Sequence, residues 1–322
     1  MNLTQYAADL ETIRAASTRI SGYAHKTPIF QSRAINEISG REVFFKCEQF
    51  QRVGAFKFRG AFNAIAKRVA ADVPAAFVTH SSGNHAQAVA LAAKLHNIPA
   101  HIVMPTNAPD IKRRAVLSYG AAVHPCEPIL TERERVAEHV CHETGGVLIP
   151  PYDHPDVIAG QGTVALELLE QVSDLDAVIC PVGGGGLLSG MTLALKAVNP
   201  NISIFGAEPK GADDAARSKA ENRLILQTDP QTIADGLRTS LGQYTWPVIR
   251  DLVDDILVVD DDQIIGAMRM IWERMKLLIE PSAAVGLATL LSGHFDAHMC
   301  HRRIGIVLTG GNMDLTTLPW SA

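Results

Sequence analysis

The sequence predicts an α/β fold of two domains, with open twisted sheets that carry helices on both faces. Short apolar runs of strand length alternate along the chain with amphipathic or alanine-rich runs of helix length. The connections between them are rich in glycine and proline, as is typical of such sheets. The chain has 322 residues, and single cores stop growing near about 250–300 residues, so we expect a second core.

The first set of elements begins with an amphipathic helix at 8–20 and a strand at 43–46. Further strands are expected at 76–79, 101–104, 121–123 and 147–149, and helices at 86–95, 110–118 and 132–143.

The second set consists of helices at 163–173, 187–198, 263–276 and 282–291, and strands at 177–182, 203–206, 256–259 and 304–308. Taken together, the two sets predict two α/β lobes, one nested in the other.

The composition is that of a globular enzyme. Hydrophobic residues make up 47% of the chain and charged residues 20%, which excludes a disordered chain. The net charge is −5 and the basic residues are scattered, so we expect neither nucleic acid nor a membrane as a partner. There is no signal-peptide pattern, no apolar run of membrane-spanning length and no C-x-x-C pair among the five cysteines. A cytoplasmic protein with free thiols is therefore expected.

The most informative stretch is residues 55–60, Ala-Phe-Lys-Phe-Arg-Gly, which leads into a helix. It places Lys57 between two phenylalanines, where an ammonium is costly to bury and tends to lose its proton. A neutral lysine is a nucleophile, and its commonest use is a Schiff base with a carbonyl substrate or with pyridoxal phosphate. The alternative is a lysine whose ammonium extends to the surface between two core side chains.

Two loops follow predicted strands, where ligands of such sheets bind. Ser81-Ser82-Gly83-Asn84-His85 runs into the helix at 86–95, so its hydroxyl and amide groups could bind a carboxylate or phosphate, or simply cap the helix. Gly183-Gly184-Gly185-Gly186 separates the strand at 177–182 from the next helix. Consecutive glycines are entropically costly, and they indicate backbone N–H groups that closely approach a phosphate.

The glycine run also raises the alternative of a protein that binds a nicotinamide dinucleotide. Glu208 lies about 20 residues further on, where an acid could bind a ribose. However, no G-x-G-x-x-G register fits, because the third glycine would have to be Leu188 or Ser189. The dinucleotide hypothesis is therefore the weaker one.

Other polar residues each keep two interpretations. Thr309, in the loop 309–312 after the strand at 304–308, could bind a ring nitrogen or cap the next turn. Asp213 and Asp214 could hold a hard cation or lie in an exposed turn. A C-terminal cluster is better explained as a surface loop than as a metal site: His294, His298, Cys300 and His301.

Several longer motifs cover nearly the whole chain: FFKCE (44–48), GAFKFRG (54–60), THSSGNHAQ (79–87), IAGQGT (158–163), PVGGGG (181–186), AEP (207–209), TIADG (232–236), WERMKLLIEP (272–281) and LTGGN (308–312). Together they resemble the fold-type II pyridoxal-phosphate enzymes, specifically the group of serine racemases and serine/threonine dehydratases, with threo-3-hydroxyaspartate ammonia-lyases almost as similar. The resemblance implies a two-domain fold like that of the tryptophan synthase β-subunit. Residues 1–68 and 155–322 would form the large cofactor-binding domain, and residues 76–153 a small mobile domain that closes over the substrate.

The resemblance also implies the roles of individual residues. Lys57 would hold the cofactor as a Schiff base and act as the base on one face of the substrate Cα, and Ser82 would be the acid or base on the opposite face. The other implied cofactor ligands are Asn84, Tyr152, Gly183, Gly184, Gly185, Gly186, Leu187, Gly236 and Thr309. The implied substrate ligands are Ser81, Ser82, Asn84, His85, Arg133 and Thr239. Glu208, the carbonyl of Ala212, and Asp214 match a site for Mg²⁺, Ca²⁺ or Mn²⁺.

The expected reaction follows from the resemblance and from the ring environment that it implies. A neutral hydroxyl at the pyridine nitrogen, from Thr309, would make the ring a weaker electron sink, which favours prompt loss of a β-hydroxyl group over a long-lived carbanion. We therefore predict a serine racemase that also eliminates water from serine to give pyruvate and ammonia. The alternatives are a threo-3-hydroxy-L-aspartate ammonia-lyase, which forms oxaloacetate, and a catabolic L-threonine/L-serine dehydratase. The family is usually homodimeric.

Other positions bear on substrate and regulation. Arg133 could pair with a second carboxylate, as in hydroxyaspartate, or form a surface ion pair within Glu132-Arg133-Glu134-Arg135. Tyr152 stands where racemases more often carry asparagine, and the surrounding Pro-Pro-Tyr-Asp is more typical of dehydratases and hydroxyaspartate lyases. Arg52-Val53 replaces the Lys-Thr of the mammalian-type nucleotide site, which speaks against ATP as an effector.

Overall fold

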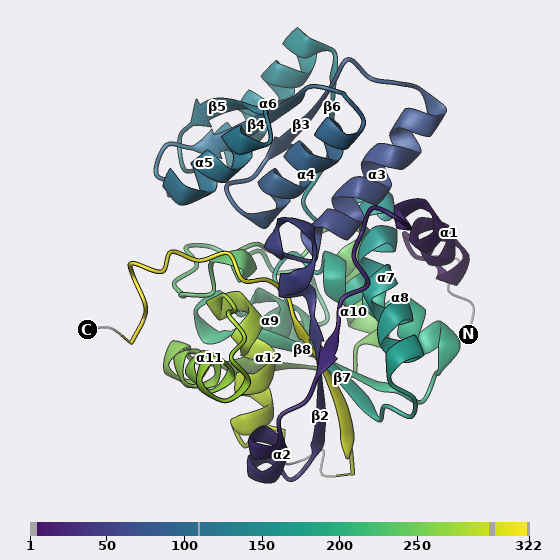
Figure 1. The fold of residues 1–322 in the computed structure, drawn as a ribbon, viewed down its shortest axis with the longest axis vertical. Helices are drawn as coiled ribbons and strands as arrows, with labels where there is room; N and C mark the ends of the chain where they lie inside the picture. The colour runs from purple at the N-terminus through teal and green to yellow at the C-terminus, as the bar shows by residue number, and fades with distance from the viewer. Residues whose placement is uncertain (1–4, 109, 296–299, 321–322) are drawn as a thin grey trace.

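The computed structural model describes residues 5–108, 110–295 and 300–320 and contains two sheets, each covered by helices (Figure 1). The six-stranded sheet has the order β1-β2-β10-β7-β8-β9, and the four-stranded sheet has the order β5-β4-β3-β6. Neighbouring strands are parallel throughout, except that β1 and β2 are antiparallel. The predicted α/β fold with helices on both faces of open sheets is confirmed.

The larger lobe is built on the six-stranded sheet. Its strands are β1 (Ile29–Phe30), β2 (Glu42–Cys47), β7 (Ala177–Pro181), β8 (Ser203–Pro209), β9 (Asp255–Val259) and β10 (Arg303–Leu308). Its helices are α1 (Leu10–Ile20), α2 (Arg33–Ser39), α7 (Pro155–Gln171), α8 (Gly186–Val198), α9 (Asp214–Glu221), α10 (Thr245–Leu252), α11 (Asp261–Met275) and α12 (Pro281–Leu291). Short 3-10 helices lie in its connections: η1 (Glu48–Phe50), η2 (Arg52–Gly54), η3 (Lys210–Ala212) and η4 (Asp235–Leu237).

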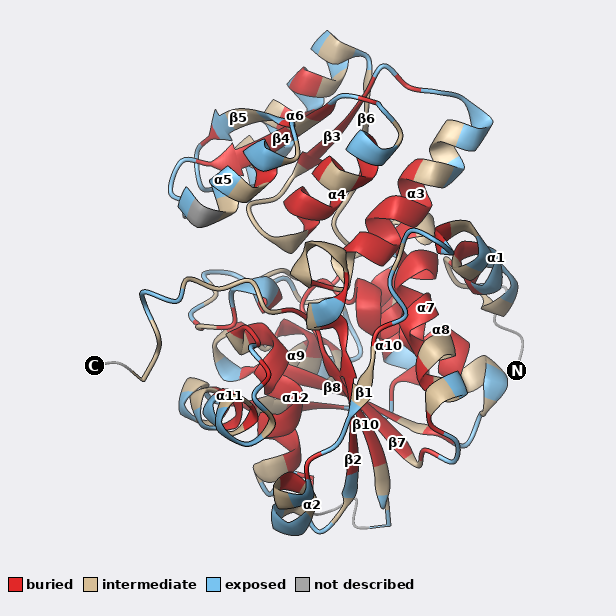
Figure 2. Cartoon of the chain, in the orientation of Figure 1, coloured by how far each residue is buried: buried red, intermediate tan, exposed pale blue. Residues whose placement is uncertain are grey.

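Both faces of this sheet are buried (Figure 2). Successive residues of a strand point to opposite faces, and in β7 they enter different cores. Val178 and Cys180 pack with α1, α7, α8 and α10, whereas Ala177 and Ile179 pack with α2, α11 and α12. Strands covered on both faces read as continuous apolar runs, which explains why the sequence predicted them well.

The smaller lobe is built on the four-stranded sheet. Its strands are β3 (Ala76–His80), β4 (Ala100–Pro105), β5 (Ala122–Cys126) and β6 (Gly146–Leu148), and its helices are α4 (Asn84–Leu95), α5 (Asp110–Ser118) and α6 (Leu130–Thr144). This sheet therefore spans residues 76–148, inside the expected small domain at 76–153. The domain boundaries themselves remain a prediction. None of the helices described in either lobe is both long and apolar enough to cross a lipid bilayer.

Helix α3 (Lys57–Ala71) connects the two lobes (Figure 1). Near its start, Gly60 lies against α7 of the larger lobe. The two backbones are so close there that a Cβ atom added at Gly160 would be 2.6 Å from the Cα of Gly60. Further along the helix, Phe62 and Ile65 share a core with Val89 of α4. The start of α3 is thus fixed on the larger lobe, and the rest of the helix carries the chain toward the smaller one.

The structure corrects several expectations. Helix α7 begins at Pro155, two turns before the expected start at 163. Gly160 and Gly162 weakened the helical pattern there, but the crossing helices need them, because Cβ atoms at these positions would lie 2.6 and 2.7 Å from backbone atoms of residues 60 and 190. Close packing overrides intrinsic helix propensity in this segment. The short elements β1, α2, α9 and α10 were not predicted.

We expect Gly160→Ala to lower the free energy of unfolding by about 1–3 kcal/mol, because the added methyl group meets backbone atoms of α3 that have no room to move. Gly266→Ala is the matched control. Gly266 also lies inside a helix, α11, but nothing lies within 4 Å of an added Cβ. That variant should gain about 0.5–1 kcal/mol. Equal denaturation midpoints for the two variants would contradict this account of the α3–α7 contact.

Candidate active site

The loops after β3 and β10 meet at the start of α3, and the loop after β7 lies against Tyr152, next to the Pro151 carbonyl that accepts from Lys57. The backbone N–H of Phe56 donates to the carbonyl of Thr309 at 3.1 Å. Asn312, in the loop after β10, donates through Nδ2 to Oδ1 of Asn84 at 2.8 Å, which joins the larger lobe to the loop after β3. The sheet topology thus places the sequence-predicted residues Lys57, Asn84 and Thr309 close together.

Lys57 is the first residue of α3 and is partly buried. Its Nζ donates to the carbonyl of Pro151 at 2.7 Å and lies 5.1 Å from the centre of the Phe56 ring. Burial lowers the pKa of Lys57 to about 8, although the nearby carboxylate of Glu280 acts in the opposite direction. More of this amine is therefore unprotonated near neutral pH than in an ordinary lysine, and the unprotonated amine is the form that attacks a carbonyl.

Glu280 is a site residue that the sequence did not single out. It is buried, and its carboxylate accepts hydrogen bonds from Nδ2 of Asn84 at 2.9 Å and from the backbone N–H of Asn312 at 3.0 Å. Burial raises the pKa of Glu280, and the charge of Asp235 adds to this effect. The available signal was an acidic residue at the end of the apolar run Leu277–Ile279, directly before the helix-starting Pro281.

The loop at 81–85 is not a simple helix cap. Helix α4 begins at Asn84 after Gly83, and no side chain caps its first turn. The Ser81 hydroxyl instead accepts from the N–H of Gly83 at 3.3 Å, and Ser82 is partly exposed in the same loop. The N-terminus of α4 thus keeps backbone N–H groups that have no intrahelical partner, next to serine hydroxyls.

His85 is buried and uncharged at neutral pH. Burial and the charge of Lys57 lower the pKa of His85 to about 3. Its Nε2 bonds to the carbonyl of Ile149 at 2.9 Å, so this nitrogen carries the proton. Nδ1 is buried, and no described residue bonds to it, which leaves it as the ring's acceptor.

The glycine run lies where β7 ends and α8 begins. A Cβ atom at Gly184 would overlap the ring of Tyr152, and one at Gly183 would lie 2.9 Å from Cα of Leu237 and 3.3 Å from Oγ1 of Thr239. Gly185 has a φ of +83° and precedes the first residue of α8. The run thus lets Tyr152 and residues 236–239 approach the first turn of α8, whose leading N–H groups lack intrahelical partners.

Arg133 does not form the surface ion pair considered above. In that charged run it is Arg135 that pairs with Glu132, at 2.7 Å. Arg133 instead donates through Nη2 to the carbonyl of His80, at the end of β3, at 3.1 Å. Its Nε is buried and bonds to no described residue, and burial lowers the pKa of Arg133. The guanidinium therefore retains a donor for a further acceptor.

The expected cation ligands form a separate buried group beyond the glycine run. Glu208 accepts from the backbone N–H groups of Ala215 and Ala216 at 3.0 and 2.9 Å, and Asp214 accepts from that of Leu241 at 3.1 Å. Burial and the proximity of Asp214 raise the pKa of Glu208, and burial raises the pKa of Asp214 to about 6. One oxygen of Asp214 is buried and bonds to no described residue.

Asp213 and the C-terminal histidine and cysteine cluster were the other candidate metal ligands. Asp213 is partly exposed, and its carboxylate forms an ion pair with Arg217 at 2.7 Å. Of the C-terminal cluster, His298 lies outside the described residues. Among the residues that the structure describes, no group of three or more His, Cys, Asp and Glu side chains is placed to hold a metal ion.

Comparisons with known proteins agree with this site. The family model described as "Pyridoxal-phosphate dependent enzyme" matches residues 20–310. A serine racemase of rice (Oryza sativa subsp. indica) is 52% identical over 316 residues, which cover 97% of this chain and 93% of the relative. The structure of maize serine racemase has a TM-score of 0.95 and 53% identity, over 97% of this chain and 96% of that one. A pyridoxal 5'-phosphate-dependent aspartate racemase also has a TM-score of 0.95, with 38% identity over 99% and 100% of the two chains.

The family match runs from α1 to the loop after β10, and it therefore includes Lys57, the glycine run and Thr309. Identity of about half the residues over nearly the full length extends the agreement to both lobes. The resemblance found in the sequence is confirmed: the chain belongs to the family of pyridoxal-phosphate dependent enzymes.

Proposed function

We propose that this protein racemises serine and also eliminates water from serine, giving pyruvate and ammonia. The observation that carries the proposal is Lys57, a partly buried lysine whose pKa is lowered to about 8 where three strand-end loops converge. The serine racemase relatives support serine as the substrate. The dinucleotide alternative has no comparable support, because the glycine run fits no dinucleotide register.

The residues present fit pyridoxal phosphate. Lys57 supplies the amine, and the backbone N–H groups of Gly183–Gly186 and of the first turn of α8 would bind the phosphate. Asn84, Tyr152, Leu187, Gly236 and Thr309 would complete the site, as the family resemblance implies. When bound, this cofactor supplies the electron sink that makes the substrate Cα–H acidic.

The two faces of the substrate would be served by different side chains. Lys57 takes the Cα proton on one face, and Ser82, from the loop after β3, holds or returns a proton on the other. Ser81, Asn84 and His85 would bind the substrate carboxylate, with Thr239 nearby. Because Thr309 offers the ring a neutral hydroxyl rather than a carboxylate, departure of the β-hydroxyl group competes with reprotonation.

A dicarboxylic substrate is the second candidate. The partly buried Arg133 retains an unsatisfied Nε, and a second carboxylate would satisfy it. Aspartate racemase, with its TM-score of 0.95, supports this reading, as does Tyr152 in place of the usual asparagine. The activity would then be that of a threo-3-hydroxy-L-aspartate ammonia-lyase, with threonine dehydration as a lesser alternative.

We also propose a divalent cation at Glu208, the carbonyl of Ala212, and Asp214. Burial raises the pKa of both carboxylates, the charge of Asp214 further raises the pKa of Glu208, and an oxygen of Asp214 bonds to no described residue. A cation such as Mg²⁺ would remove this unfavourable burial of charge. Activity as a cytoplasmic homodimer, closure of the small domain at 76–153 over the substrate, and the absence of ATP activation complete the proposal.

The proposal is tested by assaying L-serine and L-threo-3-hydroxyaspartate side by side with Mg²⁺ and quantifying D-serine, pyruvate and oxaloacetate. Ser82→Ala should reduce D-serine formation by about 100-fold or more, since a positioned acid or base contributes that much. Pyruvate formation from L-serine should change by less than about tenfold, because Lys57 serves that face. Lys57→Ala is the control and should give a colourless protein without either activity. Equal loss of both activities in Ser82→Ala would refute the two-face assignment.

Arg133 separates the two substrate classes. Arg133→Gln should lower kcat/KM for hydroxyaspartate by about 10–100-fold, because one charge-assisted hydrogen bond to the second carboxylate is lost. The kcat/KM for serine, which has no second carboxylate, should stay nearly unchanged. Arg135→Gln is the matched control, because Arg135 is exposed in the same helix and pairs with Glu132. Unchanged hydroxyaspartate kinetics in Arg133→Gln would exclude a substrate contact.

The cation site is tested by thermal melting. Mg²⁺ should raise the melting temperature of the wild-type protein and a chelator should lower it, since a ligand that binds only the folded state stabilises it. Glu208→Gln should abolish this response, whereas Asp213→Asn, which removes the ion pair with Arg217 and leaves both proposed ligands in place, should retain it. A wild-type melting temperature and activity that ignore the chelator would speak against the site.

A further inference from the structure

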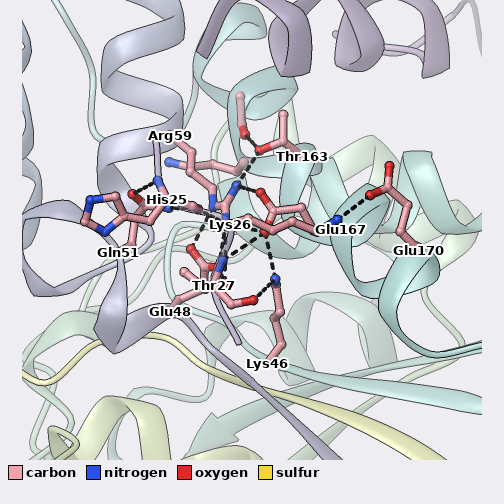
Figure 3. Close-up of polar contacts among 12 residues, drawn as sticks. His25, Lys26, Thr27, Lys46, Glu48, Gln51, Arg59, Thr163, Glu167 and Glu170 are labelled. Atoms are coloured by element: carbon pink, nitrogen blue, oxygen red, sulfur yellow. Dashed lines mark hydrogen bonds and ion pairs between the residues drawn. The ribbon is translucent and has the colours of Figure 1, made fainter. Parts of the chain in front are cut away.

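Figure 3 shows a group of buried charged side chains next to the start of α3. These side chains have no role in the reaction proposed for the site. The group consists of Lys46, Glu48, Arg59 and Glu167, which we call the buried charge cluster. The side chains of Lys46, Glu48 and Arg59 are 0% exposed, and that of Glu167 is 18% exposed. Two cations and two carboxylates give a net charge of zero, as burial requires.

Arg59 is the centre of this cluster. Its Nε and Nη2 donate to Glu48 at 2.7 and 2.8 Å, and its Nη1 and Nη2 donate to Glu167 at 2.7 and 2.9 Å. Burial alone would lower the pKa of Arg59, but the two carboxylates outweigh burial and raise it. A planar guanidinium that binds two carboxylates at once is fixed in position and in orientation.

The cluster attaches α3 to several parts of the larger lobe. Glu48 follows β2, and Glu167 belongs to α7. Arg59 also donates to the hydroxyl of Thr163 in α7 and to the carbonyl of His25, both at 3.3 Å. All of these partners belong to the larger lobe.

Lys57 stands on the other side of the same helical turn. Residues two apart in a helix point in nearly opposite directions, so Arg59 faces the cluster while Lys57 faces Pro151 and the candidate site. No side chain caps the start of α3. The first turn is held instead by the Arg59 contacts and by the bond from the Gly60 N–H to Gln161 at 3.2 Å.

We propose that Arg59 is a positioning residue: by binding Glu48 and Glu167 it fixes the first turn of α3 and thereby holds the Lys57 amine where it captures the cofactor. The inference rests on the role proposed for Lys57. A buried ion cluster adds little stability compared with apolar packing, but each of its charges requires its partners in place. Such a cluster therefore specifies a geometry more than it adds stability.

The test measures how fast the apo-protein captures pyridoxal 5'-phosphate at a series of pH values. Absorbance follows the capture, and borohydride reduction with mass spectrometry identifies the modified lysine. Arg59→Lys keeps the positive charge but replaces the planar guanidinium by a single ammonium group. Glu48→Gln removes one of the two carboxylates that bind Arg59. In both we expect capture at pH 7.5 to slow about tenfold or more and the midpoint of the pH profile to rise by about one unit. A loosened Lys57 is better hydrated and more often protonated.

Lys46→Met is the matched control. It removes one cation of the cluster and should lower the melting temperature, but Lys46 bonds to Thr27, Glu167 and Gln171 and to no residue of α3. Its capture rate should stay within about twofold of wild type, because Arg59 keeps its bonds to both Glu48 and Glu167 and so stays fixed in orientation.

Arg59→Lys and Glu48→Gln variants with the wild-type rate and pH profile would overturn the proposal, and so would an equal slowing in Lys46→Met. If Arg59→Lys does not fold, Glu48→Gln decides the matter alone. Capture at another lysine in the wild-type protein would overturn the proposed role of Lys57 and with it that of Arg59, whereas capture at Lys57 with unchanged kinetics in the variants would overturn the role of Arg59 alone.

Discussion

The site depends on the different surroundings of two basic side chains, Lys57 and Arg59, in the first turn of α3. Arg59 is enclosed by carboxylates, which keep its charge and raise its pKa. Among the described residues, no carboxylate lies within ion-pair distance of Lys57, and burial lowers its pKa to about 8. A guanidinium stays charged in proteins, whereas a buried ammonium readily loses its proton. One helical turn thus combines a permanent cation, which binds the helix to the larger lobe, with an amine that is able to react.

Glycines make this arrangement sterically possible. The crossing of α3 and α7 brings Gly60 and Gly160 into backbone contact, which places Arg59 within reach of Glu167. In the glycine run, Gly184 gives room to the ring of Tyr152 and Gly183 to the segment at 236–239. The sequence suggested that the run exists to approach a phosphate. The structure adds a second reason, which is that the protein itself packs against these positions.

Much of this could be predicted from the sequence, for physical reasons that differ by element. Strands buried on both faces, such as β7, give continuous apolar runs, and the loops that follow them carry the unusual residues. The first two turns of α7 could not be predicted, because Gly160 and Gly162 are chosen by tertiary contacts rather than by helix propensity. Glu280 and Glu167 also escaped notice. A lone acidic residue shows its importance only when burial removes its solvent and a distant residue, Asn84 or Arg59, becomes its partner.

The charges around Lys57 indicate how the site would select among anionic ligands. His85 is neutral, because burial and Lys57 lower its pKa to about 3, and burial raises the pKa of Glu280. An incoming phosphate or carboxylate would therefore meet mainly the N–H groups at the starts of α4 and α8, whose partial positive charges suit anions. Arg133 differs from these groups, because it is a full cation with a spare donor at the end of β3. The binding of one carboxylate thus depends on the backbone of the fold, whereas a preference for a second carboxylate depends on a single side chain. A substitution of Arg133 alone can therefore change the substrate preference, while the residues around Lys57 stay the same.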